Sequence, residues 1–209
     1  CFMAKPNEDH AGSGMHFHVS MMDRDGRNIF MEETEGKWTE AILHALGGLQ
    51  STMGESMLVF APHANSWRRF ASQSYAPVSP TWGVNNRSVA LRIPAGDITA
   101  RRIEHRPSGV DANAYLVAAT VLAGIRHGMT QHIDPGPETA GNGYEGTNDA
   151  LPIPMDWRQA IEAAKSSDFL KAALGPEMHR TFTAIKAAEY ARVMRTVSEV
   201  DYDLYLHTV

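Results

Sequence analysis

The segment Gly12–Ser20, GSGMHFHVS, constrains the fold of this chain most, because it places two histidines behind a glycine-rich approach. If the segment forms a strand, alternation directs His16, His18 and Ser20 to one face and apolar side chains to the other. A hydrophobic interior rarely accepts two imidazoles and a hydroxyl in a row, so we expect that face to border a polar site. A His-x-His pair alone is weak evidence for a binding site, because imidazoles are also common as structural, hydrogen-bonded groups, and both interpretations stay open. The preceding glycines would let the backbone approach a ligand closely.

The composition is that of an ordinary folded domain with an acidic balance. The 209 residues, 43% of them hydrophobic, suffice for one domain over residues 1–209 with a sizeable core. A formal net charge of −5 argues against general binding to nucleic acid or to anionic membranes, which requires a basic surface. The single cysteine, Cys1, and the lack of an apolar run of ~18 residues favour a cytoplasmic protein. The first residue is not methionine, so we expect a fragment of a longer protein.

Hydrophobic periodicity predicts several helices. Apolar residues at three- and four-residue steps predict a helix over 41–53 that ends at Gly54. A second helix is predicted to start at an Asp111 cap, and it is apolar on nearly every side, which indicates burial. Further helices are predicted after Asp156, as a cap, and after Pro176.

The middle of the chain combines strand-like segments with clustered arginines. Residues 60–106 are punctuated by proline and carry few helical signals. Seven of the chain's fourteen arginines lie between Arg68 and Arg106, where the only acids are Asp97 and Glu104. Converging guanidinium groups suit a ligand with more than one anionic group, because each offers a planar fork to carboxylate or phosphate oxygens. Solvated surface arginines are the alternative explanation.

The segment 102–106, RIEHR, places a carboxylate between two cations. Alternation puts Arg102, Glu104 and Arg106 on one face of a strand. Flanking cations lower the pKa of a carboxylate and keep it ionised, which suits a metal ligand, although a structural ladder of ion pairs explains the pattern equally well. Together with His16, Glu104 would form a mixed imidazole and carboxylate set of the kind that binds Mg²⁺ or Mn²⁺ with substrate phosphates.

Several ordered motifs resemble those of the glutamine synthetase family. They are FMAKP at 2–6, GSGMHFHVS at 12–20, NSWRRF at 65–70, NRS at 86–88 with LRIP at 91–94, and RIEHR at 102–106. The resemblance implies an α+β fold in which a curved antiparallel β-sheet, half of the family's catalytic barrel, carries helices packed outside. It also implies that residues 1–209 are the C-terminal part of the catalytic domain. The N-terminal domain and the first metal-binding carboxylates would then lie upstream of Cys1.

The same resemblance assigns roles to individual residues. It implies that His16 and Glu104 bind a metal ion, Mg²⁺ or Mn²⁺. It further implies that His18 and Ser20 contact the nucleotide and that the backbone at Gly12 contacts glutamate.

Four arginines and one tyrosine complete the site implied by the family. Arg69 and Arg106 would hold glutamate, Arg87 and Arg92 would face the phosphates of ATP, and Arg87 and Arg106 would take part in catalysis. Tyr75 stands where ammonia-using members carry a glutamate. A neutral phenol neither binds nor deprotonates ammonium well, so Tyr75 indicates a different amine.

The resemblance therefore implies an ATP-dependent carbon–nitrogen ligase that joins an amine to the γ-carboxylate of glutamate through γ-glutamyl phosphate. The chain looks most similar to γ-glutamylpolyamine (γ-glutamylputrescine) synthetases, with ATP and Mg²⁺ or Mn²⁺ as cofactors. An ammonia-using glutamine synthetase, a non-catalytic structural homologue and a phosphotransferase acting on guanidino compounds are the alternatives. We expect the full-length protein to be a homo-oligomer, a dodecamer of two stacked hexameric rings, without nucleic acid or membrane partners. The fragment alone is expected to be inactive.

Overall fold

Four short strands form one mixed sheet in the computed structural model, which describes residues 1–209 except 33, 35, 71–73, 75, 145–152 and 209. The sheet order is β1-β4-β3-β2, with β1 at Phe17–Val19, β2 at Trp82–Val84, β3 at Leu91–Ile93 and β4 at Ile103–His105. Both β1 and β3 run antiparallel to β4, whereas β2 runs parallel to β3. The predicted α+β class is confirmed. The β2–β3 pair differs from the expected antiparallel arrangement, because the connection between the two strands crosses back along the sheet instead of forming a hairpin. The described strands do not close into a barrel.

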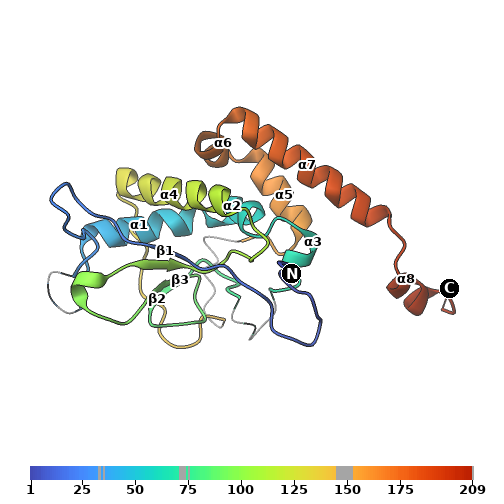
Figure 1. The fold of residues 1–209 in the computed structure, drawn as a ribbon, viewed down its shortest axis with the longest axis horizontal. Coiled ribbons are helices and arrows are strands. Elements are labelled where there is room, and N and C mark those ends of the chain that lie inside the picture. The colour runs from blue at the N-terminus through green and yellow to red at the C-terminus, as the bar shows by residue number, and fades with distance from the viewer. Residues whose placement is uncertain (33, 35, 71–73, 75, 145–152, 209) are drawn as a thin grey trace.

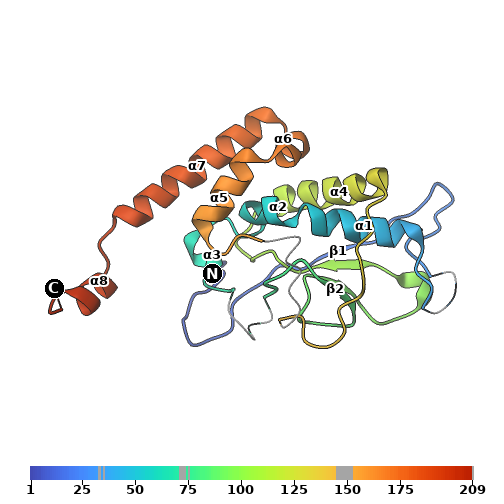
Figure 2. The ribbon, with the colours of Figure 1, turned by 180° about the vertical axis from the view of Figure 1, so that it is seen from behind.

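Three helices cover one face of this sheet (Figures 1 and 2). They are α1 at Glu40–Ser51, α2 at Met53–Phe60 and α4 at Ala114–Gln131. The helices and the strands share one hydrophobic core, whose fully buried members include Leu46, Leu58, Leu91, Ile103 and Ile125. The expectation of helices packed outside a small sheet is therefore confirmed.

Glycines allow α1 and α4 to approach closely. A Cβ atom on Gly48 would collide with the carbonyl oxygen of Gly124, and a Cβ atom on Gly128 would collide with that of His44. Only glycine permits this spacing between the two helix backbones.

The C-terminal helices extend beyond the sheet. They are α5 at Trp157–Ser166, α6 at Asp168–Leu174, α7 at Pro176–Arg195 and α8 at Glu199–Tyr205, while the short α3 at Ala64–Trp67 and the 3-10 helix at Ile98–Ala100 lie in connections. The helix α5 packs against α2, and Figure 1 shows α7 and α8 reaching away from the sheet. In the described part of the chain, no helix has the length and apolar character needed to cross a membrane.

Two predicted helix starts are confirmed, but one predicted burial is wrong. Asp156 caps α5 by accepting a hydrogen bond from a backbone N–H of its first turn, and Pro176 is the first residue of α7. The helix α4 was predicted to be buried on nearly every side, yet Tyr115 is 88% exposed and Leu122 is 53% exposed. This helix lies on top of the sheet layer and therefore buries the side that meets α1, α2 and α6.

Two predicted helix boundaries are also wrong. Gly54 does not end a helix, because it lies inside α2, whose later residues are buried in the core. Asp111 does not cap α4; Asn113 does, with its side chain accepting from two backbone N–H groups. The Asp111 carboxylate is engaged elsewhere, since Ser66 donates to its Oδ2 at 2.7 Å and His63 Nδ1 lies 3.1 Å from the same oxygen.

The loop 134–144 lies along the outer edge of β2. The backbone N–H of Thr139 donates to the carbonyl oxygen of Trp82, and the backbone N–H of Val84 donates to the carboxylate of Glu138. This loop therefore occupies the side of β2 that does not pair with β3.

Candidate functional site

Charged side chains gather on the sheet face opposite the helices. Ile103 and Leu91 point into the helix-covered core, so alternation sends Glu104 and Arg92 to the other face. The strand register then places these two residues opposite each other, and it places His18 of β1 opposite Glu104 on the far side. Three residues that lie far apart in the sequence thus form one row across three strands.

Glu104 is the centre of this row. Its side chain is 2% exposed, and its two oxygens accept hydrogen bonds of 2.6 Å from Arg106 Nη1 and Arg92 Nη1. His16, which directly precedes β1, places Nδ1 3.0 Å from the Oε1 atom that Arg106 also contacts. The predicted ion pair of Glu104 with Arg106 is therefore confirmed, but Arg92, and not Arg102, is the second arginine on this carboxylate. The cluster joins four of the predicted site residues.

Electrostatics fix the protonation of this cluster. Burial raises the pKa of Glu104, but the hydrogen bonds from Arg106 and Arg92 outweigh it and hold the pKa below its usual value. Burial lowers the pKa of His16, and the charge of Arg106 lowers it further. Glu104 is thus a carboxylate and His16 a neutral imidazole at pH 7, the forms in which both can bind a metal ion.

The His16 and Glu104 pair fits part of a divalent metal site. Their nearest donor atoms are 3.0 Å apart, which matches the ~3.0 Å edge between neighbouring ligands of an octahedral ion held at ~2.1 Å. Within the described ranges, no group of three or more His, Cys, Asp or Glu side chains could hold a metal ion. The described residues could therefore supply two ligands of such an ion, since a carboxylate oxygen that accepts one hydrogen bond keeps a second lone pair.

Further contacts extend the cluster along the sheet. Arg106 Nη2 donates to the carbonyl oxygen of Arg87 at 2.9 Å, so these two predicted site residues are adjacent. Arg102, which shares the face of Glu104 as predicted, donates from Nε to His18 Nδ1 at 3.3 Å. Ser20 lies exposed just after β1.

One residue of the cluster was missed by the sequence analysis, and one predicted residue cannot be placed. Asn85 accepts a hydrogen bond of 2.7 Å from Arg92 Nη2, although nothing in the sequence analysis assigned it a role. The signal that could have identified it is an asparagine pair at the end of a strand, directly before a predicted site arginine. Tyr75 lies outside the described residues.

Arg69 packs against three glycines, one of which also lies beside His16. Its side chain is buried, and its Nη1 donates to the carbonyl oxygen of Pro107 at 3.3 Å. A Cβ atom on Gly12 would lie 2.7 Å from Arg69 Cγ, one on Gly14 would lie 3.0 Å from Nη2, and one on Gly109 would lie 3.2 Å from Nη1. The space beside the first two glycines, which we expected a ligand to approach, is thus filled by Arg69. The prediction that the Gly12 backbone contacts glutamate is not tested by this geometry.

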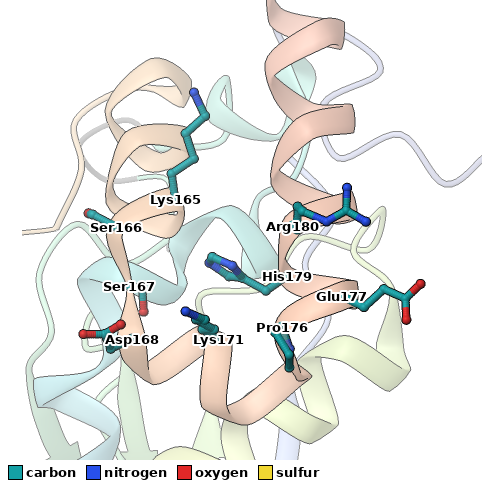
Figure 3. A pocket seen from close by; sticks show the side chains of 9 residues that line it. All are labelled: Lys165, Ser166, Ser167, Asp168, Lys171, Pro176, Glu177, His179 and Arg180. Carbon is teal, nitrogen blue, oxygen red and sulfur yellow. The ribbon is translucent and has the colours of Figure 1, made fainter.

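A separate cavity of about 600 Å³ lies between α5, α6 and α7 (Figure 3). Figure 3 shows the side chains of Lys165 and Arg180 pointing in different directions, so these two cations do not converge on one point. His179, which also lines it, has its Nε2 atom 2.7 Å from the carbonyl oxygen of Ala164. Binding sites combine an enclosed shape with a few convergent polar groups, and the cluster around Glu104 meets the second condition far better.

Comparisons with known proteins show which family the chain belongs to. The family model described as glutamine synthetase, catalytic domain, matches residues 1–205. Gamma-glutamylputrescine synthetase PuuA of Escherichia coli (strain K12) is 40% identical over 205 residues, which are 98% of this chain and 43% of that protein. Gamma-glutamylethanolamide synthetase GlnA4 of Streptomyces coelicolor is 38% identical over 177 residues, 85% of this chain and 37% of that protein.

A solved structure shares the fold. The GmaS/ADP complex superposes with a TM-score of 0.87 at 29% identity and covers 99% of this chain and 49% of that chain. The chain thus spans about half the length of the proteins that it matches. Its match to the catalytic-domain model over nearly all residues shows that it belongs to the glutamine synthetase family.

Proposed function

We propose that the protein containing this chain is an ATP-dependent ligase that joins an amine to the γ-carboxylate of glutamate. One observation carries the proposal: buried Glu104 is held between Arg92 and Arg106 while His16 lies 3.0 Å from the same carboxylate. The cluster combines a metal-binding pair with guanidinium groups. Such a combination neutralises the oxygens of a phosphoryl group during its transfer.

The proposed reaction has two steps. A γ-carboxylate oxygen of glutamate attacks the γ-phosphorus of ATP, which releases ADP and forms γ-glutamyl phosphate. The amine nitrogen, after losing a proton, then attacks the acyl carbon and displaces inorganic phosphate.

Four residues act on the phosphates in this proposal. His16 and Glu104 hold Mg²⁺ or Mn²⁺, which when bound offsets the negative charge of the phosphate oxygens. Arg92 and Arg87 face the phosphates of ATP. The hydrogen bond that links the Arg87 carbonyl oxygen to the cluster supports a shared site for these groups.

The remaining predicted residues bind the two substrates. Arg69 and Arg106 hold glutamate through their guanidinium groups, and the backbone at Gly12 contacts it. The burial of both arginines supports this role, because a desolvated guanidinium binds a carboxylate more strongly than an exposed one. His18 and Ser20, exposed at β1, contact the nucleotide.

A polyamine such as putrescine is the proposed acceptor. Tyr75 lacks the negative charge that an ammonium site needs, and an aromatic ring can cover methylenes and attract an alkylammonium group. The names of the PuuA and GlnA4 relatives, which refer to putrescine and ethanolamide, support an amine larger than ammonia. Ammonia is the alternative acceptor.

Phosphate release by the intact protein with ATP and glutamate tests the proposal. We expect a higher kcat/KM for putrescine or a longer polyamine than for ammonium. Tyr75→Glu should shift the preference toward ammonium, whereas the control Tyr75→Phe, which keeps the ring uncharged, should not. Better turnover of ammonium by the wild type would assign the protein to the ammonia-using enzymes. Absence of release with every amine would favour a non-catalytic homologue.

The proposal also covers the chain in isolation and the assembly of the whole protein. The 209-residue chain alone should have negligible ligase activity, because its described residues supply two metal ligands. It would form the C-terminal part of the catalytic domain in a cytoplasmic homo-oligomer, a dodecamer of two stacked hexameric rings.

A further inference from the structure

Asn85 has a left-handed backbone conformation that no helix end requires. Its φ is 50°, and among the described residues His132, with a φ of 52°, is the other non-glycine residue with a positive φ. His132 ends α4 as the C-cap, where this conformation is common. Asn85 follows β2 directly and caps no helix. Asparagine tolerates this conformation better than most residues, but a positive φ outside a helix end still calls for an explanation beyond the local turn.

The side chain of Asn85 supplies that reason. Its Oδ1 atom accepts a hydrogen bond of 2.7 Å from Arg92 Nη2, while Arg92 Nη1 donates to Glu104 Oε2 at 2.6 Å. The two acceptors come from different parts of the sheet, the end of β2 and the middle of β4. A guanidinium group held at both terminal nitrogens cannot rotate its plane, so Asn85 fixes the orientation of Arg92.

The neutrality of the Asn85 amide matters as much as its position. Arg92 and Arg106 share the single carboxylate of Glu104, so the three side chains carry one net positive charge. A second carboxylate at position 85 would cancel that charge. An amide oxygen holds the guanidinium in place and leaves the charge available to an anionic ligand.

We propose that Asn85 is a positioning residue, which orients Arg92 toward the nucleotide phosphates without neutralising it. This inference rests on the proposed function, in which Arg92 faces ATP. It adds a residue that acts on the phosphates only through Arg92.

Glycine at position 85 separates the side-chain contact from the backbone conformation. Asn85→Gly keeps a residue that adopts positive φ freely but removes the acceptor for Arg92. With the intact protein, we expect the Kd for ATP, measured by isothermal titration calorimetry, to rise about fivefold, because ATP binding must then order the Arg92 side chain. The KM for ATP should rise with it, the KM for glutamate should stay unchanged, and the thermal midpoint should fall by at most a few degrees, as for the loss of one hydrogen bond.

His132→Gly is the matched control, since it replaces the other left-handed residue at the end of α4. It should leave the Kd for ATP unchanged. A wild-type Kd in Asn85→Gly, or an equal loss of affinity in His132→Gly, would overturn the inference while leaving the proposed function intact. A wild-type protein that does not bind ATP would instead overturn the proposed function, and the inference with it.

Asn85→Asp tests whether the positive charge of the cluster matters. It also replaces Asn85→Gly as the test variant if the glycine variant is unstable. It keeps an acceptor for Arg92 and tolerates the backbone, but it cancels the positive charge of the cluster. We expect it to weaken ATP binding, with a loss that shrinks as the salt concentration rises. Wild-type affinity in this variant would show that Arg92 does not act through its charge on the phosphates and would overturn the inference.

Discussion

Lowering the pH from about 7.5 to about 5 should destabilise this chain through His105, the last residue of β4. The side chain is 1% exposed, and its Nδ1 atom has no hydrogen-bond partner among the described residues. Its ring packs against Phe60 at a centroid distance of 4.4 Å. Burial, with a smaller contribution from His16, lowers the pKa of His105 from 6.5 to about 3. The folded chain therefore keeps this imidazole neutral under conditions in which the unfolded chain protonates it.

The magnitude follows from the difference in proton binding between the two states. Above a pH of about 6.5 both states are neutral at His105, and the residue contributes nothing that depends on pH. As the pH falls below the pKa of His105 in the unfolded chain, the unfolded state binds a proton at His105 and the folded state does not. The free energy of unfolding therefore decreases. At pH 5, about 1.5 units below that pKa, the loss amounts to about 2 kcal/mol.

Urea unfolding followed by tryptophan fluorescence at the two pH values measures this loss. His105→Phe removes the titrating group and keeps an aromatic ring beside Phe60, so it is the matched reference. Between the two pH values, the wild type should lose about 2 kcal/mol more than the variant. Equal losses would refute a buried, neutral His105. His16, whose pKa is also lowered, titrates in both proteins, and its contribution cancels in the comparison.

Three further predictions concern the site. Glu104→Gln leaves two largely buried guanidinium groups without their carboxylate and should cost about 3 kcal/mol in urea unfolding; a change near zero would contradict the ion-pair geometry. Arg106→Lys should lower kcat/KM for glutamate at least about tenfold in a phosphate-release assay, because a point charge cannot replace a bidentate fork. Gly14→Ala adds a methyl group 3.0 Å from Arg69 Nη2 and should raise the KM for glutamate in the wild type but not in an Arg69→Lys background. Equal costs in both backgrounds would show that Gly14 serves something other than Arg69.

The polar face of the site could be predicted from alternation alone. The spacing of His16 and His18, and that of Arg102, Glu104 and Arg106, correctly predicted which side chains share a face. The contact between these two sets of side chains could not be derived from spacing, because it depends on the strand register that pairs His18 with Glu104, 86 positions apart in the sequence. The pairing of His16 with Glu104 was therefore a hypothesis from their metal-binding chemistry, which the resemblance to the family supported through the shared motifs.

The helix boundaries show where local signals fail. Asp156 caps a helix as predicted because its partner lies three residues away, within the same turn. Asp111 looked like an equally good cap, but Ser66 and His63, distant in sequence, compete for its carboxylate. Gly54 looked like a helix end, yet a glycine inside a helix costs only about 1 kcal/mol, which burial of the following turn offsets.

The loop 134–144 along β2 also bears on aggregation through the edge of the sheet. The outer strand of a sheet exposes backbone groups that invite pairing with a foreign strand. Here Thr139 and Glu138 already form hydrogen bonds with the backbone of Trp82 and Val84, so these backbone groups are not available to a strand of another chain. Asn86 strengthens the closure by donating to the carbonyl oxygen of Thr139. Asn86 thus helps to cover this edge of the sheet, while the preceding residue, Asn85, contacts Arg92 on the polar face.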